Sequence, residues 1–138
     1  MVKLRYPLFS FGSFLSTFKN ALLKKKVNFF VHYSKLNALI CEYFFKNHFF
    51  SEVFYLYTNK NDCCFILVTM ESFEGELILK NINILYKPSR PLYMNAKKLK
   101  RMLNRQKAVF LLSTSEGILN SVEALQIGVG GIILFEYY

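Results

Sequence analysis

Residues 111–118 of the chain read Leu-Leu-Ser-Thr-Ser-Glu-Gly-Ile, and more of the interpretation depends on them than on any other stretch. The apolar start of this stretch predicts a buried strand. It leads directly into Ser113, Thr114 and Ser115, whose small hydroxyls can each donate and accept hydrogen bonds. Gly117 follows, and without a Cβ it lets another backbone or a ligand come close. Such a turn can hold phosphate oxygens, ribose hydroxyls and base edges, although hydroxyl clusters are also common in turns that bind nothing.

The residues on either side of this turn predict a small mixed α/β lobe. Asn120 and Glu123 have the spacing of a capping box, with asparagine in place of serine or threonine, so a short helix should start there. Gly128 would end that helix as its C′ residue. Pro88 and Pro91 mark the start of the lobe, because proline interrupts both helices and central strands. The lobe is expected to span residues 87–138, with a helix over 96–104, a strand over 108–112, the short capped helix and a strand over 132–138.

Before the prolines, the sequence predicts an α-β-α-β-β lobe over residues 1–86. Apolar residues recur at helical spacing from Phe11 to Leu22, and Ser34 has the position of an N-cap for a second helix that ends near Asn47. The predicted fold class is α+β, with this lobe packed on the smaller C-terminal one. Leu36, Leu39, Ile40 and Tyr43 are expected on the inward side of the second helix, and strands are expected over residues 27–31, 51–57, 63–70 and 76–86, with a hairpin turn at 59–62.

The charge of the chain narrows its partners. Lysine and arginine number 18 against 9 aspartate and glutamate residues, a formal charge of +9. Such an excess indicates a polyanionic partner, either nucleic acid or an acidic membrane surface. The longest stretch without a charge spans residues 6–18, which is shorter than the about 20 residues that a bilayer span needs, so we expect no membrane insertion. That stretch is expected to fold as a helix and not to act as a signal peptide, because it lacks a small-residue cleavage site.

The sequence does not offer the residue patterns of an enzyme. Catalysis needs a base beside a nucleophile or a pair of carboxylates. His32 and His48 both lie among apolar residues, where a packing role is expected. Cys41, Cys63 and Cys64 have neither metal-ligand spacing nor the even number of a disulfide framework. We therefore expect no catalytic residues, no metal, no cofactor and no small-molecule substrate.

Five segments, in order along the chain, carry a resemblance to a known family. The hydroxyl turn, residues 113–115, is followed by a second segment in which the predicted short helix leads into Gly-Val-Gly-Gly at residues 128–131. Upstream, residues 87–93 read Lys-Pro-Ser-Arg-Pro-Leu-Tyr, a basic-proline segment that ends in tyrosine. Two N-terminal segments are similar to the family's first helix and to the start of its second helix. They are Phe-Leu-Ser-Thr-Phe-Lys-Asn at residues 14–20 and Ser-Lys-Leu at residues 34–36. Together the segments resemble the bacterial-type small-subunit ribosomal protein eight family over nearly the whole chain.

The chain departs from the family's pattern at four positions. Thr17 and Glu116 stand where basic residues are common. Ser89 replaces a usual glycine, and Ile132 follows the double glycine where the family often has an acidic residue.

The resemblance implies a structural constituent of the small ribosomal subunit. It implies binding to the central domain of small-subunit rRNA and support for platform assembly and translation, with neighbouring small-subunit proteins as further partners. It also implies RNA contacts by the hydroxyl turn and Gly117, with Tyr93 stacking or packing beside them. The residues implied to position phosphates are Lys19, Asn20, Ser34 and Lys35 in the N-terminal lobe and Lys87 and Arg90 near the joint. A basic protein peripheral to a membrane, or an RNA-binding protein outside the ribosome, is the alternative.

Two further basic clusters stay open. Lys24, Lys25 and Lys26 follow the first predicted helix, where cations suit the helix dipole. The predicted helix over 96–104 gathers a basic side. Each cluster could meet RNA, another protein or only water.

The amino-acid usage indicates the compartment. Phenylalanine (15) and tyrosine (9) are abundant, tryptophan is absent, and asparagine and lysine recur. These are residues that AT-rich codons favour, so we expect an organelle genome and a mitochondrial ribosome. A plastid or the bacterial cytoplasm is the alternative location.

Overall fold

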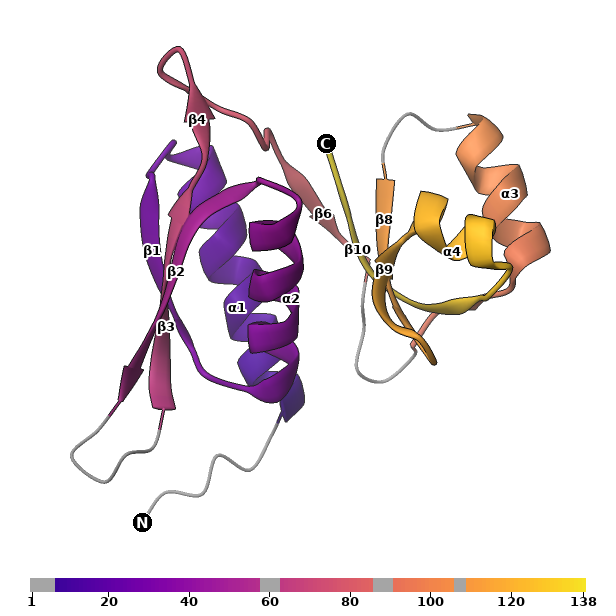
Figure 1. The fold of residues 1–138 in the computed structure, drawn as a ribbon, viewed down its shortest axis with the longest axis horizontal. Helices are drawn as coiled ribbons and strands as arrows, with labels where there is room; N and C mark the ends of the chain where they lie inside the picture. The colour runs from indigo at the N-terminus through magenta and orange to yellow at the C-terminus, as the bar shows by residue number, and fades with distance from the viewer. Residues whose placement is uncertain (1–6, 58–62, 86–90, 106–108) are drawn as a thin grey trace. The chain divides into compact units, whose positions relative to one another are not determined.

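The computed structural model describes residues 7–57, 63–85, 91–105 and 109–138 (Figure 1). The chain divides into two compact units, Met1–Leu79 and Lys80–Tyr138, and each is described by itself. Both units combine helices with antiparallel strands, which confirms the predicted α+β class. The predicted hairpin turn at residues 59–62 lies outside the described residues.

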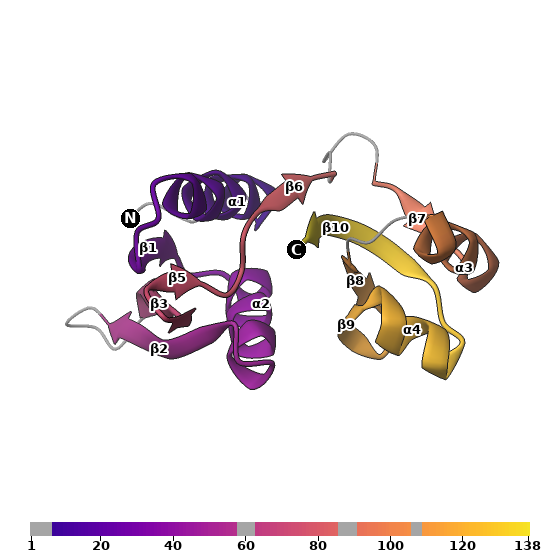
Figure 2. The same ribbon diagram turned by 90° about the horizontal axis from the view of Figure 1, so that it is seen from above.

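The first unit has two helices on one face of a three-stranded sheet (Figures 1 and 2). The antiparallel sheet has the strand order β1-β3-β2, so the last strand lies between the first two. A small hairpin of β4 (Ser72–Phe73) and β5 (Glu76–Leu77) follows. In chain order the main elements are α1 (Pro7–Leu23), β1 (Asn28–His32), α2 (Lys35–Lys46), β2 (Phe50–Tyr57) and β3 (Cys63–Met70).

Phenylalanine rings fill the space between the helices and this sheet. The Phe18 ring centroid lies 5.4 Å from that of Phe29, 5.5 Å from that of Phe50 and 5.9 Å from that of Phe44. All four side chains are buried. Aromatic pairs at such distances contribute about 0.5–1.5 kcal/mol beyond the burial of their area. Part of the high phenylalanine content of the chain therefore serves to form the hydrophobic core of the first unit.

The inward face of α2 differs from the predicted one. Ile40 and Tyr43 are buried as expected, but Leu39 is exposed and Leu36 is only half-buried. Successive residues lie about 100° apart around a helix, so Leu39 is turned away from the buried side that Ile40 shares with Cys41. A polar residue takes part in that side instead. Asn37 is buried, and its Nδ2 donates to the His32 carbonyl oxygen at 3.0 Å.

The second unit consists of an antiparallel sheet and two helices. Its sheet has the strand order β6-β10-β8-β9, and the short β7 pairs with β10. The two helices of this unit, α3 and α4, contact each other, and α4 packs on β8. The buried core contains Met94, Leu99, Phe110, Leu112, Ala124 and Ile133. The elements are β6 (Ile82–Ile84), β7 (Tyr93–Met94), α3 (Ala96–Arg105), β8 (Val109–Thr114), β9 (Gly117–Asn120), α4 (Ser121–Ile127) and β10 (Gly131–Tyr137).

The strand predicted over residues 76–86 is wrong as a single element. It is divided into β5, which pairs with β4, and β6, which pairs with β10 of the second unit. Between them the backbone N–H groups of Lys80 and Asn81 both donate to the Tyr138 carbonyl oxygen, at 2.7 and 3.0 Å. The units therefore divide between Leu79 and Lys80, earlier than the boundary expected between residues 86 and 87.

Candidate RNA-binding site

The hydroxyl turn joins two paired strands. Thr114 at the end of β8 pairs with Gly117 at the start of β9, which leaves Ser115 and Glu116 at the tip. The Thr114 Oγ1 donates to the Gly117 carbonyl oxygen at 2.7 Å and accepts from the Glu116 N–H at 3.1 Å. Gly117 has φ +105°, a conformation that side chains rarely adopt. Thr114 and Gly117 thus shape the turn, while Ser115 is exposed and Ser113 half-buried at its surface.

Tyr93 is brought to the same sheet face as Ser113. Both residues pair with Ile132 of β10, Tyr93 from β7 and Ser113 from β8. Directly paired residues point to the same face of a sheet, and neighbouring strands lie about 4.8 Å apart. The phenol and the hydroxyl therefore flank Ile132 at roughly 10 Å across the strands. Tyr93 is 63% exposed, so its ring offers an open stacking surface.

Two glycines allow this close arrangement. A Cβ on Gly130 would lie 2.3 Å from the Met94 carbonyl oxygen, and one on Gly131 would lie 2.5 Å from the Ser113 carbonyl oxygen. Any larger residue would push β10 away from β7 or β8. The sequence indicated these glycines only as the entry to a strand. In the structure they set the spacing between Tyr93 and the hydroxyl turn.

The helix after the turn holds β8 in place. Asn120 and Glu123 form the predicted capping box, with Glu123 N–H donating to Asn120 Oδ1 at 2.8 Å and Asn120 N–H to Glu123 Oε1 at 3.2 Å. Gly128 ends the helix in the left-handed conformation with φ +86°, also as predicted. The buried Ser121 Oγ accepts from the Phe110 N–H at 3.2 Å. This bond ties α4 to the strand that carries the turn.

The candidate residues of the first unit lie at its helix ends. Lys19 is half-buried and Asn20 exposed near the end of α1, and Lys35 is exposed at the start of α2. Ser34 is the N-cap of α2, as predicted, because its Oγ accepts from the Asn37 N–H at 3.0 Å. The Ser34 hydroxyl therefore stabilises the start of α2.

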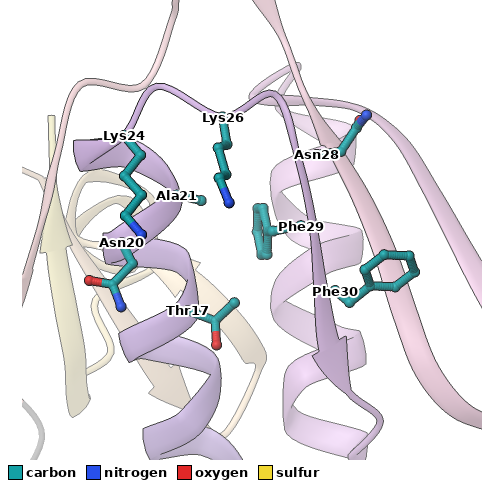
Figure 3. Close-up of a pocket in the computed structure, with 8 residues that line it drawn as sticks. All are labelled: Thr17, Asn20, Ala21, Lys24, Lys26, Asn28, Phe29 and Phe30. Carbon is teal, nitrogen blue, oxygen red and sulfur yellow. The ribbon is translucent and has the colours of Figure 1, made fainter.

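A pocket beside the end of α1 is lined by Lys24 and Lys26, whose binding partner the sequence did not decide. Figure 3 shows Lys24 and Lys26 with Asn20 and Thr17 between α1 and β1. The pocket has a volume of about 490 Å³. Two ammonium groups, an amide and a hydroxyl suit a phosphate with an adjoining sugar. Only the adjacency of lysines in the sequence pointed to this cluster. The full lining is Thr17, Asn20, Ala21, Lys24, Lys26, Asn28, Phe29 and Phe30.

Two other basic groups were predicted near the joint and on a helix. Lys87 and Arg90 lie outside the described residues. On α3 the buried Leu99 faces the core, and the cations lie on the exposed side: Lys97, Lys98, Lys100 and Arg101. Asn95 caps this helix, since its Oδ1 accepts from the Lys98 N–H at 2.9 Å, a cap that was not predicted.

Within the described ranges, no group of three or more histidine, cysteine or acidic side chains could hold a metal ion. No helix in that part of the chain is long and apolar enough to cross a bilayer. Burial raises the pKa of the Cys41 thiol, which keeps it protonated at neutral pH and weakens it as a nucleophile. Desolvation, together with the hydrogen bond that Tyr55 donates to Glu42 Oε1, raises the pKa of Tyr55.

A basic α+β chain that presents a hydroxyl turn and an open tyrosine on one sheet face has the features of an RNA-binding protein. Comparison with known proteins gives the family. The model of the family described as "Ribosomal protein S8" matches residues 10–138. The chain therefore belongs to this family, which confirms the resemblance found in the sequence.

The chain is similar to curated members over nearly its full length. It is 30% identical over 130 residues to the small ribosomal subunit protein uS8c of Bigelowiella natans, covering 92% of this chain and 96% of that protein. It is 28% identical over 123 residues to uS8c of Phaeodactylum tricornutum, covering 87% and 90%. It is also 30% identical over 126 residues to uS8 of Bartonella quintana, covering 89% and 92%.

Proposed function

We propose that the chain is a structural constituent of the small ribosomal subunit and binds the central domain of the small-subunit rRNA through its hydroxyl turn. Membership of the ribosomal protein S8 family supports the ribosomal role. The observation that carries the site is the alignment of Tyr93, Ile132 and Ser113 across β7, β10 and β8. Tyr93 can stack on an unpaired base while Ser113 and Ser115 bond to sugar, phosphate or base edges, which is how folded RNA is usually recognised.

The first unit would add phosphate contacts through Lys19, Asn20 and Lys35, and Lys87 and Arg90, which precede β7 in the sequence, would add two more. Lysine and arginine contacts act mainly through the release of counterions, so their share of the affinity depends on salt. The hydroxyl and tyrosine contacts carry no charge and should be nearly independent of salt. The two kinds of contact can therefore be measured separately.

The compartment is proposed as the mitochondrial ribosome. The support is the abundance of residues that AT-rich codons encode, with 15 phenylalanines and 9 tyrosines among 138 residues. The relatives named above are plastid and bacterial proteins, so a plastid ribosome or a bacterial one is the competing location. Fractionation of the source cells, with the chain followed by mass spectrometry, would decide. Sedimentation with mitochondrial small subunits is expected, and sedimentation with plastid subunits would contradict the proposal.

Binding of the full chain to a small-subunit rRNA fragment, measured over a range of salt concentrations, tests the function. Replacing Lys19 and Lys35 by alanine should flatten the dependence of log Kd on log salt by about 0.7–0.9 for each phosphate that is no longer neutralised. The Leu39→Ala variant, which removes an exposed apolar side chain of α2, serves as the control and should leave the slope unchanged. Equal binding to a central-domain fragment and to an unrelated RNA of the same length would refute the proposed specificity.

A further inference from the structure

The sheet of the first unit has a second face, opposite α1 and α2, where nine side chains form a regular grid. Pairing of β1 and β2 with the central β3 aligns residues from all three strands. The buried residues of β1 and β3, such as Phe29 and Ile66, point to the helices, so the alternate residues point away from them. The three rows are Asn28–Thr69–Glu52, Phe30–Leu67–Phe54 and His32–Phe65–Leu56.

Five of the nine side chains are apolar, although this face is exposed: one row, Phe30–Leu67–Phe54, is wholly apolar, and the next adds Phe65 and Leu56 beside His32. Antiparallel sheets with one face on a core usually present polar side chains on the other. Here Phe30 is 57% exposed and Phe54 50% exposed, and Phe65 and Leu56 are exposed as well. The side chains are adjacent in the grid and so form one continuous patch. Contiguous exposed apolar patches are uncommon on soluble monomers and usually mark an interaction site.

The remaining row has the properties of a polar rim. Thr69 Oγ1 donates to Asn28 Oδ1 at 2.8 Å, and Glu52 ends the row on β2. Across the patch, the His32 ring centroid lies 5.1 Å from that of Phe65. Aromatic and aliphatic side chains at the centre with polar ones at the edge are the usual arrangement of a protein–protein interface.

Charge decides which kind of partner fits. The chain has 18 lysines and arginines, yet none occupies any of the nine grid positions, and the one formal charge there is the carboxylate of Glu52. A polyanion such as RNA would find no counter-charge on this face. The lysines of the basic pocket lie beside the edge strand β1: Figure 3 shows Phe30 and Asn28 directed to the other side of β1 from Lys26 and Phe29, although both also line the border of that pocket. The basic pocket and the exposed apolar face thus meet at β1, with the pocket lysines on one side of the strand and the grid side chains on the other.

We infer that this face docks an apolar segment of a neighbouring protein in the small ribosomal subunit, with a basic side chain or an amide donor opposite Glu52. The inference rests on the proposed ribosomal function. It assigns a protein partner to the surface formed by Phe30, Phe54, Phe65, Leu56 and Leu67. It also gives a role to aromatic residues that the phenylalanine core does not use.

A photo-reactive phenylalanine analogue at position 54, in the chain assembled into small subunits, tests the inference. Phe45 on α2 is a matched control, since it is a phenylalanine with 49% exposure that does not belong to the grid. After irradiation of purified subunits, we expect one identified ribosomal protein to be crosslinked at position 54 at least fivefold more than at position 45. Crosslinks mainly to rRNA, to a second copy or to another part of this chain would overturn the inference, as would yields equal to those at position 45.

A second variant keeps the test independent of the probe. Phe54→Ser with Leu56→Ser changes only exposed side chains, so the thermal midpoint should stay within a few degrees, and the affinity for rRNA fragments within twofold, of the parent chain. Retention on subunits after a high-salt wash, which weakens RNA contacts, should fall at least threefold. Unchanged retention would contradict the docking surface. Failure of the ribosomal function itself would look different, because the parent chain would then not sediment with small subunits at all.

Discussion

Substitution of Gly131 by alanine is the sharpest perturbation of the site that the structure offers. The new Cβ would lie 2.5 Å from the Ser113 carbonyl oxygen and 2.8 Å from Thr114 Cγ2. The first distance is about 0.9 Å short of an ordinary contact at 3.4 Å. The obstacle is backbone at the end of the β8–β10 ladder, next to its first pair Ile132–Ser113, so the two strands must separate there. Overpacking of this kind costs typically about 1–3 kcal/mol.

That cost should appear as a lower thermal midpoint. For a domain of 60–100 residues, 1 kcal/mol corresponds to roughly 4–8 °C, so a cost of about 1–3 kcal/mol should lower the midpoint of Gly131→Ala by roughly 4–24 °C. Gly12→Ala is the matched control, because nothing lies within 4 Å of its added Cβ and the residue is exposed inside α1. Alanine is up to about 1 kcal/mol more favourable than glycine inside a helix, so this control should become more stable.

The same substitution should weaken RNA binding at a temperature where the variant is folded. Separation of β8 from β10 moves Ser113 relative to Tyr93, and contacts made by both residues can no longer form together. Differential scanning calorimetry and binding to a central-domain rRNA fragment at low temperature measure the two effects. A midpoint indistinguishable from that of the parent, or full affinity despite lowered stability, would refute the role given to the double glycine.

Three further predictions concern the turn itself. Replacing Ser113 and Ser115 together by alanine should weaken RNA binding about 30-fold, for two hydrogen bonds of about 1 kcal/mol each, with no change in the salt slope; unchanged affinity in a filter-binding titration would contradict the assigned contacts. Thr114→Ala should lower the free energy of unfolding by about 1–2 kcal/mol in urea titration, because its hydroxyl makes two bonds within the turn, and full stability would show that those bonds contribute nothing. Glu116→Lys places a cation at the exposed tip and should strengthen binding and steepen the salt slope by about 0.7–0.9; a weaker complex would indicate that the tip faces away from the RNA.

Features of the structure that depend on residues close in sequence were predictable. The capping box of Asn120 and Glu123, the N-cap at Ser34 and the helix end at Gly128 all involve residues within four positions of one another. Backbone conformation and local hydrogen bonds decide them. The family resemblance was likewise carried by short ordered segments.

Features that depend on distant pairing were not predictable. The two-residue strand β7 exists because Gly131 and Ile132 of β10 pair with it, and no periodicity in two residues could indicate that. β6 was assigned to the wrong lobe because its partner β10 is the last strand of the chain. The exposed apolar patch also follows from register across three strands, which alternation within one strand does not reveal.

Ultraviolet crosslinking of purified small subunits, followed by mass spectrometry of the chain's peptides, tests the central claim most directly. Nucleotide adducts from the central domain of the small-subunit rRNA are predicted on Tyr93 and on the peptide that contains residues 113–117. Adducts confined to peptides of the first unit, or the absence of RNA on both predicted peptides while others carry it, would contradict the account.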